Sequence, residues 1–257
     1  MNDDLNINLA NLTSADAASI EAMETLRDSR LTVLARHDTT PNGSHAFALA
    51  HDQSITWGTP GEPQLVAIAV GRDRNHSTFT FETSRHATAS FAQNWLIERG
   101  CPPEHITLAA DGSLNPNDDL TVQVEQQIRA AGTRYEILDT WTSDSDPGET
   151  WTLTHDSNAA QAPVRVFHEE WDHDAGTYTM REGAFADVGA AHSWLDDGPL
   201  PEPPEYSDHK GAVVRARMAR IALARSAEAA ATQKAVRAAS RTPSAGPVQR
   251  PVQGRLL

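Results

Sequence analysis

Two segments of the chain repeat each other. Residues 28–52 align without a gap on residues 132–156, and the match resumes after a loop that is five residues shorter in the second copy. The paired residues are mainly aromatic, apolar or turn-forming: Arg30 with Arg134, Leu34 with Leu138, Phe47 with Trp151, His51-Asp52 with His155-Asp156, Asp73 with Asp172, Phe79 with Tyr178, and Trp95 with Trp194. The match indicates an internal duplication, so the chain is expected to fold into two similar units.

Each copy has the pattern of a helix, four strands and a second helix. In the first copy, "RLTVLAR", "HAFALAH", "LVAIAV" and "STFTFET" alternate or are wholly apolar, as strands are, and turn-forming residues separate them. Helices are predicted over residues 14–29 and over residues 84–100, with Ser84 as the N-cap of the latter. The second copy predicts matching helices over residues 116–132 and 184–198.

The predicted fold class is α+β, an internal duplication of an α-β-β-β-β-α unit followed by a C-terminal helix and a disordered tail. Each unit is expected to form an antiparallel four-stranded sheet with one face in water. The other face is covered by the helix that carries Trp95 or Trp194, so these tryptophans are core residues. The expected parts are a first repeat 1–108, a second repeat 109–198, a proline-rich spacer 199–206, a basic Ala/Arg-rich helix 207–241 and a disordered tail 242–257.

Charge is divided sharply along the chain. Residues 1–206 hold 33 acidic and 11 basic side chains, a net charge of −22, whereas residues 207–257 hold 2 acidic and 10 basic side chains, a net charge of +8. The acidic body repels nucleic acid and membrane surfaces, and the basic tail attracts an anionic partner or its own body. The side chains expected to contact nucleic acid or a protein partner are Arg215, Arg217, Arg220 and Arg225.

Cysteine usage and hydropathy bear on the cellular compartment. Cys101 is the single cysteine, so neither an intramolecular disulfide nor a thiolate zinc cluster can form, which fits a reducing interior. No apolar run approaches the roughly 20 residues that span a bilayer. Nineteen of the 21 basic residues are arginine, a bias typical of GC-rich bacterial genomes. We expect a bacterial cytoplasmic protein without membrane association, for which an oligomeric state is compatible with the sequence.

The stretch "VFHEEWDHD", residues 166–174, resembles the zinc-protease pattern His-Glu-x-x-His. Its second histidine comes at i+5 rather than i+4, and the duplication assigns the stretch to a strand, in which three alternate residues extend over roughly 13 Å. Because a single strand cannot gather such residues around one ion, a solvated hairpin edge is favoured, with a divalent-ion site as the alternative. The metal-ligand candidates are His155, His168, Glu170 and Asp172.

A His-Asp pair recurs at the same place in both copies. Each histidine ends the apolar face of a strand, where an imidazole beside a carboxylate can act as acid or base. No serine, cysteine or further acid recurs at matching positions to complete a catalytic set, so hydrogen-bonded turn residues are the favoured interpretation. The catalytic candidates are His51, Asp52, His155 and Asp156.

Familiar nucleotide-binding and acyl-transfer motifs are absent from the sequence, and no cofactor is expected. The succession of four strands and a helix, present twice over residues 30–198, resembles in element order the PUR and Whirly single-stranded nucleic-acid-binding proteins. That resemblance implies binding through basic sheets with exposed aromatic side chains, a pattern from which the acidic body departs. No binding residues are therefore transferred from these proteins.

The sequence predicts a non-enzymatic tandem-repeat binding or adaptor protein, with an acidic body and a basic C-terminal helix that contacts an anionic partner such as nucleic acid. Two alternatives stay open. In one, the acidic body binds a basic or DNA-binding protein. In the other, the chain is a metal-dependent hydrolase that uses His155, Asp156, His168 and Glu170 around an ion.

Overall fold

The computed structural model divides the chain into two units, Met1–Pro204 and Glu205–Leu257, and both copies of the repeat lie in the first. The residues described are 5, 7–39, 43–55, 61–108, 114–143, 148–194, 200–201 and 203. No helix within these ranges is both long enough and apolar enough to cross a membrane. Three of the expected parts lie wholly or mostly outside the described residues: the spacer 199–206, the basic helix 207–241 with Arg215, Arg217, Arg220 and Arg225, and the tail 242–257.

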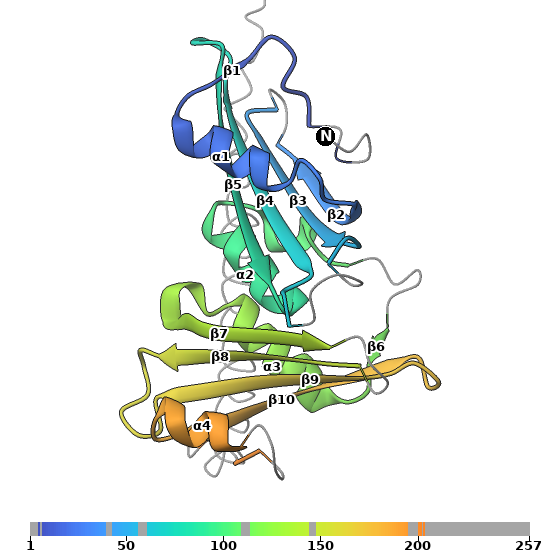
Figure 1. Ribbon diagram of the computed structural model, residues 1–257, viewed down its shortest axis with the longest axis vertical. Helices are drawn as coiled ribbons and strands as arrows, with labels where there is room; N and C mark the ends of the chain where they lie inside the picture. The colour runs from blue at the N-terminus through green and yellow to red at the C-terminus, as the bar shows by residue number, and fades with distance from the viewer. Residues whose placement is uncertain are drawn as a thin grey trace, which may run out of the picture. The chain divides into compact units, whose positions relative to one another are not determined.

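The two copies share one order of elements, which Figure 1 shows in chain order from blue to orange. The first copy consists of β1 (Thr13–Ser14), α1 (Ala17–Thr25), β2 (Leu31–Asp38), β3 (His45–Asp52), β4 (Leu65–Asp73), β5 (Thr78–His86), α2 (Ala89–Glu98) and the 3-10 helix η2 (Pro103–His105). The second consists of β6 (Asn115–Pro116), α3 (Asp119–Arg129), the 3-10 helix η3 (Gly132–Arg134), β7 (Tyr135–Ser143), β8 (Gly148–Asp156), β9 (Val164–Asp172), β10 (Thr177–Phe185) and α4 (Val188–Trp194). The expected α+β duplication is therefore present.

Each sheet has five strands rather than the expected four. The orders are β1-β5-β4-β3-β2 and β6-β10-β9-β8-β7, and the four long strands of each sheet pair antiparallel as predicted. The fifth strand, β1 or β6, is two residues long and pairs parallel with β5 or β10. It forms because the segment before the first helix runs along the sheet edge, where the N–H of Ala15 donates to the carbonyl of Phe79 and that of Asn117 to Tyr178. Two residues are too few to show a strand period in the sequence.

The duplication extends to an irregularity of the backbone. In the first sheet the register between β2 and β3 shifts between Val33 and Ala35, and in the second the register between β7 and β8 shifts between Ile137 and Asp139. The two bulges fall at equivalent positions of the alignment. A bulge bends and twists the strand that carries it, so both sheets curve at the same point.

The first helix of each copy is attached to its sheet by the same hydrogen bonds. In the first copy, Asp16 accepts a bond from the backbone N–H of Ser19 and caps α1, and the Ser19 hydroxyl accepts the backbone N–H of Phe81 on β5. The equivalent residues of the second copy are Asp118, Thr121 and Met180. A buried hydroxyl thus fixes where each helix lies on its sheet.

Both faces of each sheet are covered, whereas the sequence predicted one wet face. In the first copy, α1 and the preceding apolar segment, including Leu5, cover one face, and α2 and η2 cover the other through side chains such as Leu96 and Ile106. In the second copy, α3 covers one face and α4 the other. The prediction was wrong here because it assigned no packing surface to the first helix of each copy.

The helix α2 begins later than predicted. Residues 84–86 belong to β5, where they pair with residues 65–67 of β4, so Ser84 is a strand residue. The N-cap position is held by Thr88. The strand continues because its partner β4 offers a full row of backbone hydrogen bonds up to this point, and these bonds outweigh the capping preference of a single serine.

The helix α2 contacts the cores of both copies. Its residues Ala92 and Leu96 face the first sheet, whereas Phe91 packs in the core of the second copy, with its ring centre 5.3 Å from that of Phe167. The side chain of Asn94 donates to the carbonyl of Gly132 at 2.9 Å and accepts the N–H of the same residue at 3.0 Å. These contacts join the end of the first copy to the start of the second.

The tryptophans predicted to anchor the covering helices contact the cores but are not enclosed by them. Trp95 packs against the core of the first copy and Trp194 against that of the second, and both are half-buried. The guanidinium of Arg99 lies 3.5 Å from the centre of the Trp95 ring, a cation–π contact that covers part of its outer side.

Candidate functional site

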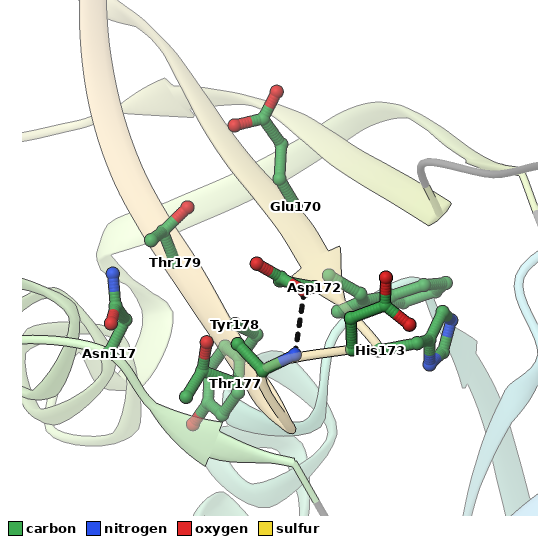
Figure 2. Close-up of a pocket in the computed structure, with 10 residues that line it drawn as sticks. Asn117, Glu170, Asp172, His173, Thr177, Tyr178 and Thr179 are labelled. Atoms are coloured by element: carbon green, nitrogen blue, oxygen red, sulfur yellow. Dashed lines mark hydrogen bonds between the residues drawn. The ribbon is translucent and has the colours of Figure 1, made fainter.

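A hollow of about 570 Å³ lies at the free end of the β9–β10 hairpin. Figure 2 shows the side chains that line it, which come from both strands, from their turn and from Asn117 after β6. Three of the ten lining residues are carboxylates and two are large aromatics, and none of the ten is arginine or lysine. These five residues are Glu170, Asp172, Asp174, Trp171 and Tyr178.

The carboxylate of Asp172 shapes the turn of this hairpin. Its Oδ1 accepts the backbone N–H of Ala175 at 2.8 Å, the dashed bond in Figure 2, and Gly176 supplies the left-handed conformation at φ +66°. In the first copy, Asp73 makes the equivalent bond, accepting the N–H of His76 at 3.2 Å. The recurrence of Asp73 and Asp172 is thus accounted for by turn geometry.

The side chains of Glu169 and Trp171 point to the opposite face of the sheet from Glu170, because strand residues alternate. The indole Nε1 of Trp171 donates to Glu169 at 2.6 Å, and the Trp171 ring lies against Gly148, where any side chain would collide with it. Burial raises the pKa of Glu169 to about 7, opposed by the Trp171 bond and aided by the carboxylate of Glu125. The ring of Trp171 is therefore fixed beside a carboxylate of reduced acidity, on the face opposite to Glu170.

The hydroxyl of Tyr178 donates to Glu125 of α3 at 2.6 Å. Burial raises the pKa of Tyr178, and the neighbouring carboxylates of Glu125 and Glu169 raise it further. The phenol therefore stays protonated, and its bond holds the turn end of the hairpin against α3.

A group of possible metal ligands lies on the Glu170 side of the same sheet. One ligand atom each from Glu149, His168 and Glu170 lies within 4.8 Å of the other two, and Nε2 of His168 is 3.1 Å from Glu149. The strand β8 supplies Glu149, which stands directly opposite Glu170 in the β8–β9 register. The sequence prediction included His168 and Glu170 but missed Glu149. Glu149 lies on a different strand and is brought to the other two only by the β8–β9 register.

The other predicted metal ligands lie elsewhere. His155 stands opposite Val164, four residues along β9 from His168 and about 13 Å away at the usual rise of a strand. Asp172 is engaged in the hairpin turn. Asp156 points to the face of the sheet opposite to His155 and His168. The four residues of the predicted hydrolase site are therefore not brought together.

The aspartates of the recurring His-Asp pairs are buried ion-pair partners. Asp52 accepts from Arg85 at 2.8 Å, and Asp156 accepts from Arg134, with Nε of the buried Arg165 3.4 Å away. Burial alone raises the pKa of Asp52 and of Asp156, but hydrogen bonds from serine, arginine and backbone donors outweigh it, so both pKa values are lowered. Each aspartate is thus charged and fixed inside the fold.

The histidines of these pairs differ between the copies. Nε2 of His51 is 3.0 Å from the side-chain oxygen of Gln64, whereas His155 is exposed. Because neighbouring residues of a strand point to opposite faces, each histidine lies on the other face from its aspartate. Neither pair forms a hydrogen-bonded dyad of the kind that a catalytic acid or base needs.

A buried histidine outside the predicted sites lies at the end of β5. His86 is 3% exposed, and neither of its ring nitrogens has a hydrogen-bond partner among the described residues. Burial, with a smaller contribution from the guanidinium of Arg99, lowers the pKa of His86 to about 4. The imidazole is therefore neutral at physiological pH. The duplication does not reveal this histidine, because its place in the second copy is taken by Phe185.

Comparison of the chain with models of known protein families, with curated proteins and with solved structures finds no match. The element-order resemblance to the PUR and Whirly proteins thus has no counterpart among these comparisons. What the chain does is therefore argued from its own residues.

Proposed function

We propose that the protein is a non-enzymatic tandem-repeat binding module whose acidic body binds a basic segment of a protein partner at the hairpin hollow. The observation that carries the proposal is the composition of the hollow, in which Glu170, Asp172 and Asp174 line the walls without an arginine or lysine. Its volume of about 570 Å³ falls within the range of ligand sites, roughly 300–1,000 Å³.

The chemistry of the walls suits a guanidinium or an ammonium group. Carboxylates accept charge-assisted hydrogen bonds from such groups, and Trp171 also lines the hollow. Trp171 is fixed by its bond to Glu169 and its packing against Gly148, so little side-chain entropy is lost when a partner binds. The excess of carboxylates over the whole body adds long-range attraction for a basic partner.

The test is binding of a labelled arginine-rich peptide to the full chain, measured by fluorescence anisotropy in EDTA, with a glutamate-rich peptide of equal length for comparison. The double variant Glu170→Gln with Asp174→Asn should weaken binding of the basic peptide by about tenfold or more. The matched control, Glu21→Gln with Asp28→Asn, removes the same charge from exposed positions of the first copy. If both double variants lost affinity for the basic peptide equally, the attraction would come from net charge alone, and a site at the hollow would be contradicted.

The basic segment 207–257 supports a second proposal, that the chain also contacts an anionic partner such as nucleic acid. The observation that supports this second proposal is the net charge of +8 in these 51 residues. Four of the basic side chains are Arg215, Arg217, Arg220 and Arg225. Labelled single-stranded DNA should bind the full chain in a salt-dependent way, and replacing these four arginines by alanine should abolish that binding. Retention of DNA binding by the variant would contradict the proposal.

A further inference from the structure

We propose that Glu149, His168 and Glu170 form a binding site for one divalent transition-metal ion of the Zn²⁺ class. The site goes beyond the proposed function and does not depend on it. It also differs from the predicted metal site, since it needs neither His155 nor Asp172 and takes a ligand from a second strand.

The geometry of the three side chains requires only a small adjustment to hold an ion. Two ligand atoms on a tetrahedral zinc ion are about 3.4 Å apart, given metal–ligand bonds of roughly 2.0–2.2 Å. Nε2 of His168 is already 3.1 Å from Glu149, and all three ligand atoms lie within 4.8 Å of one another. The exposed side chain of Glu170 closes the remaining gap by rotating about its own bonds.

The ligand set is one imidazole nitrogen and two carboxylates. Imidazole favours zinc and the neighbouring transition metals over Mg²⁺ and Ca²⁺, which prefer oxygen ligands alone. The two carboxylates compensate the charge of a divalent ion, so binding leaves no uncompensated charge on the sheet. Three protein ligands leave coordination positions for water, as in open zinc sites.

The surroundings of His168 hold its ring in place. Trp194 of α4 meets the imidazole edge-to-face, with ring centres 6.1 Å apart, and Trp151 stands opposite His168 in the β8–β9 register. The His168 side chain is 16% exposed, so its ring has little freedom while Glu170 stays mobile at the rim. Because His168 is already fixed and only Glu170 must be ordered, binding of an ion costs little side-chain conformational entropy.

The first copy provides an internal comparison. At the positions equivalent to Glu149, His168 and Glu170 it carries His45, Ala69 and Gly71, which leave a single ligand. The strands and their register are the same in both copies. The ligand set is thus a property of the second copy alone, and the expected stoichiometry is one ion per chain.

The experiment is titration of the full chain with ZnCl₂ by calorimetry, and with CuCl₂ by tryptophan fluorescence, in which bound Cu²⁺ quenches the indoles beside His168. His168→Ala should weaken Zn²⁺ binding by about tenfold or more and remove the Cu²⁺-dependent quenching. Glu149→Gln with Glu170→Gln should do the same. His155→Ala, an exposed histidine on the same face of the sheet, is the matched control and should bind as the unaltered chain does.

Equal loss in His155→Ala and His168→Ala, or an unchanged affinity in His168→Ala, would overturn the site, because the ion would then be held by scattered surface groups. Circular dichroism of each variant identifies any that fails to fold, and the double glutamine variant then carries the test. Since the peptide assay is performed in EDTA, loss of metal binding and loss of peptide binding are separate outcomes.

Discussion

The imidazole of His86 lies beside Trp95 at the position where the second copy places Phe185 beside Trp194, with ring centres 6.3 Å and 5.9 Å apart. One copy thus encloses a titratable ring where the other encloses an apolar one. Because neither nitrogen of His86 has a partner among the described residues, its burial costs free energy that Phe185 does not.

His86→Phe is therefore expected to stabilise the protein, and to do so most at low pH. The pKa of His86 is lowered to about 4 in the fold, so the unfolded chain binds its proton first as the pH falls below about 6.5. The fold loses stability through this histidine between pH 6.5 and pH 4, by about 2 kcal/mol from pH 7.5 to pH 5. Urea unfolding should show that His86→Phe raises the free energy of unfolding by about 2 kcal/mol more at pH 5 than at pH 7.5, relative to the unaltered chain. His155→Phe, at an exposed position, should retain the pH dependence.

Asp156→Asn is expected to destabilise the fold by about 3–5 kcal/mol, because a buried arginine then loses a carboxylate that faces it. Asp156 is fully buried, and it accepts from Arg134 while lying 3.4 Å from Arg165. Asp52→Asn should cost less, since its partner Arg85 is 29% exposed and can turn to water. Chemical denaturation of the two variants checks the order, and a larger effect at Asp52 would show that burial of the arginine is not the cause.

Phe91→Ala is expected to destabilise the protein by about 3–5 kcal/mol through the cavity left in the core of the second copy. The ring lies among Tyr135, Phe167 and other buried residues of that core. Hydrogen exchange should then show faster opening of β7–β10, even though the substitution lies in the first copy. Faster exchange confined to α2 would contradict the expected coupling.

Gly148→Ala is expected to displace the Trp171 ring, because a Cβ at this position would occupy the place of its six-membered ring. Overpacking of this kind costs about 1–3 kcal/mol and should shift tryptophan emission. The displaced ring should also weaken binding of the basic peptide at the hollow. Gly189→Ala in α4 is the matched control, expected to be neutral or stabilising by about 0.5–1 kcal/mol, as alanine favours a helix. If Gly189→Ala were destabilising and Gly148→Ala neutral, the expected collision between a Cβ at position 148 and the Trp171 ring would be contradicted.

Strand pattern and duplication were sufficient to predict the eight long strands and both helices of each copy. They did not predict β1 and β6, whose two residues carry no periodicity, or the packing of α1 and α3, which depends on the hydroxyls of Ser19 and Thr121. The side chain that completes the proposed metal site, Glu149, is 19 residues from His168 and is brought to it by the β8–β9 register. Register is a property of paired strands, so no motif within one strand contains this information.

The position of α2 has a consequence for how the chain acquires its structure. Phe91 precedes every strand of the second copy, yet it fills part of that copy's core, and Asn94 is bonded to the backbone of Gly132. A fragment that starts after α2 would present an unfilled apolar surface on its second sheet and would be prone to aggregate. Because the N-terminal copy emerges first during synthesis, we expect it to fold with this face of α2 uncovered and to offer that face to the later copy.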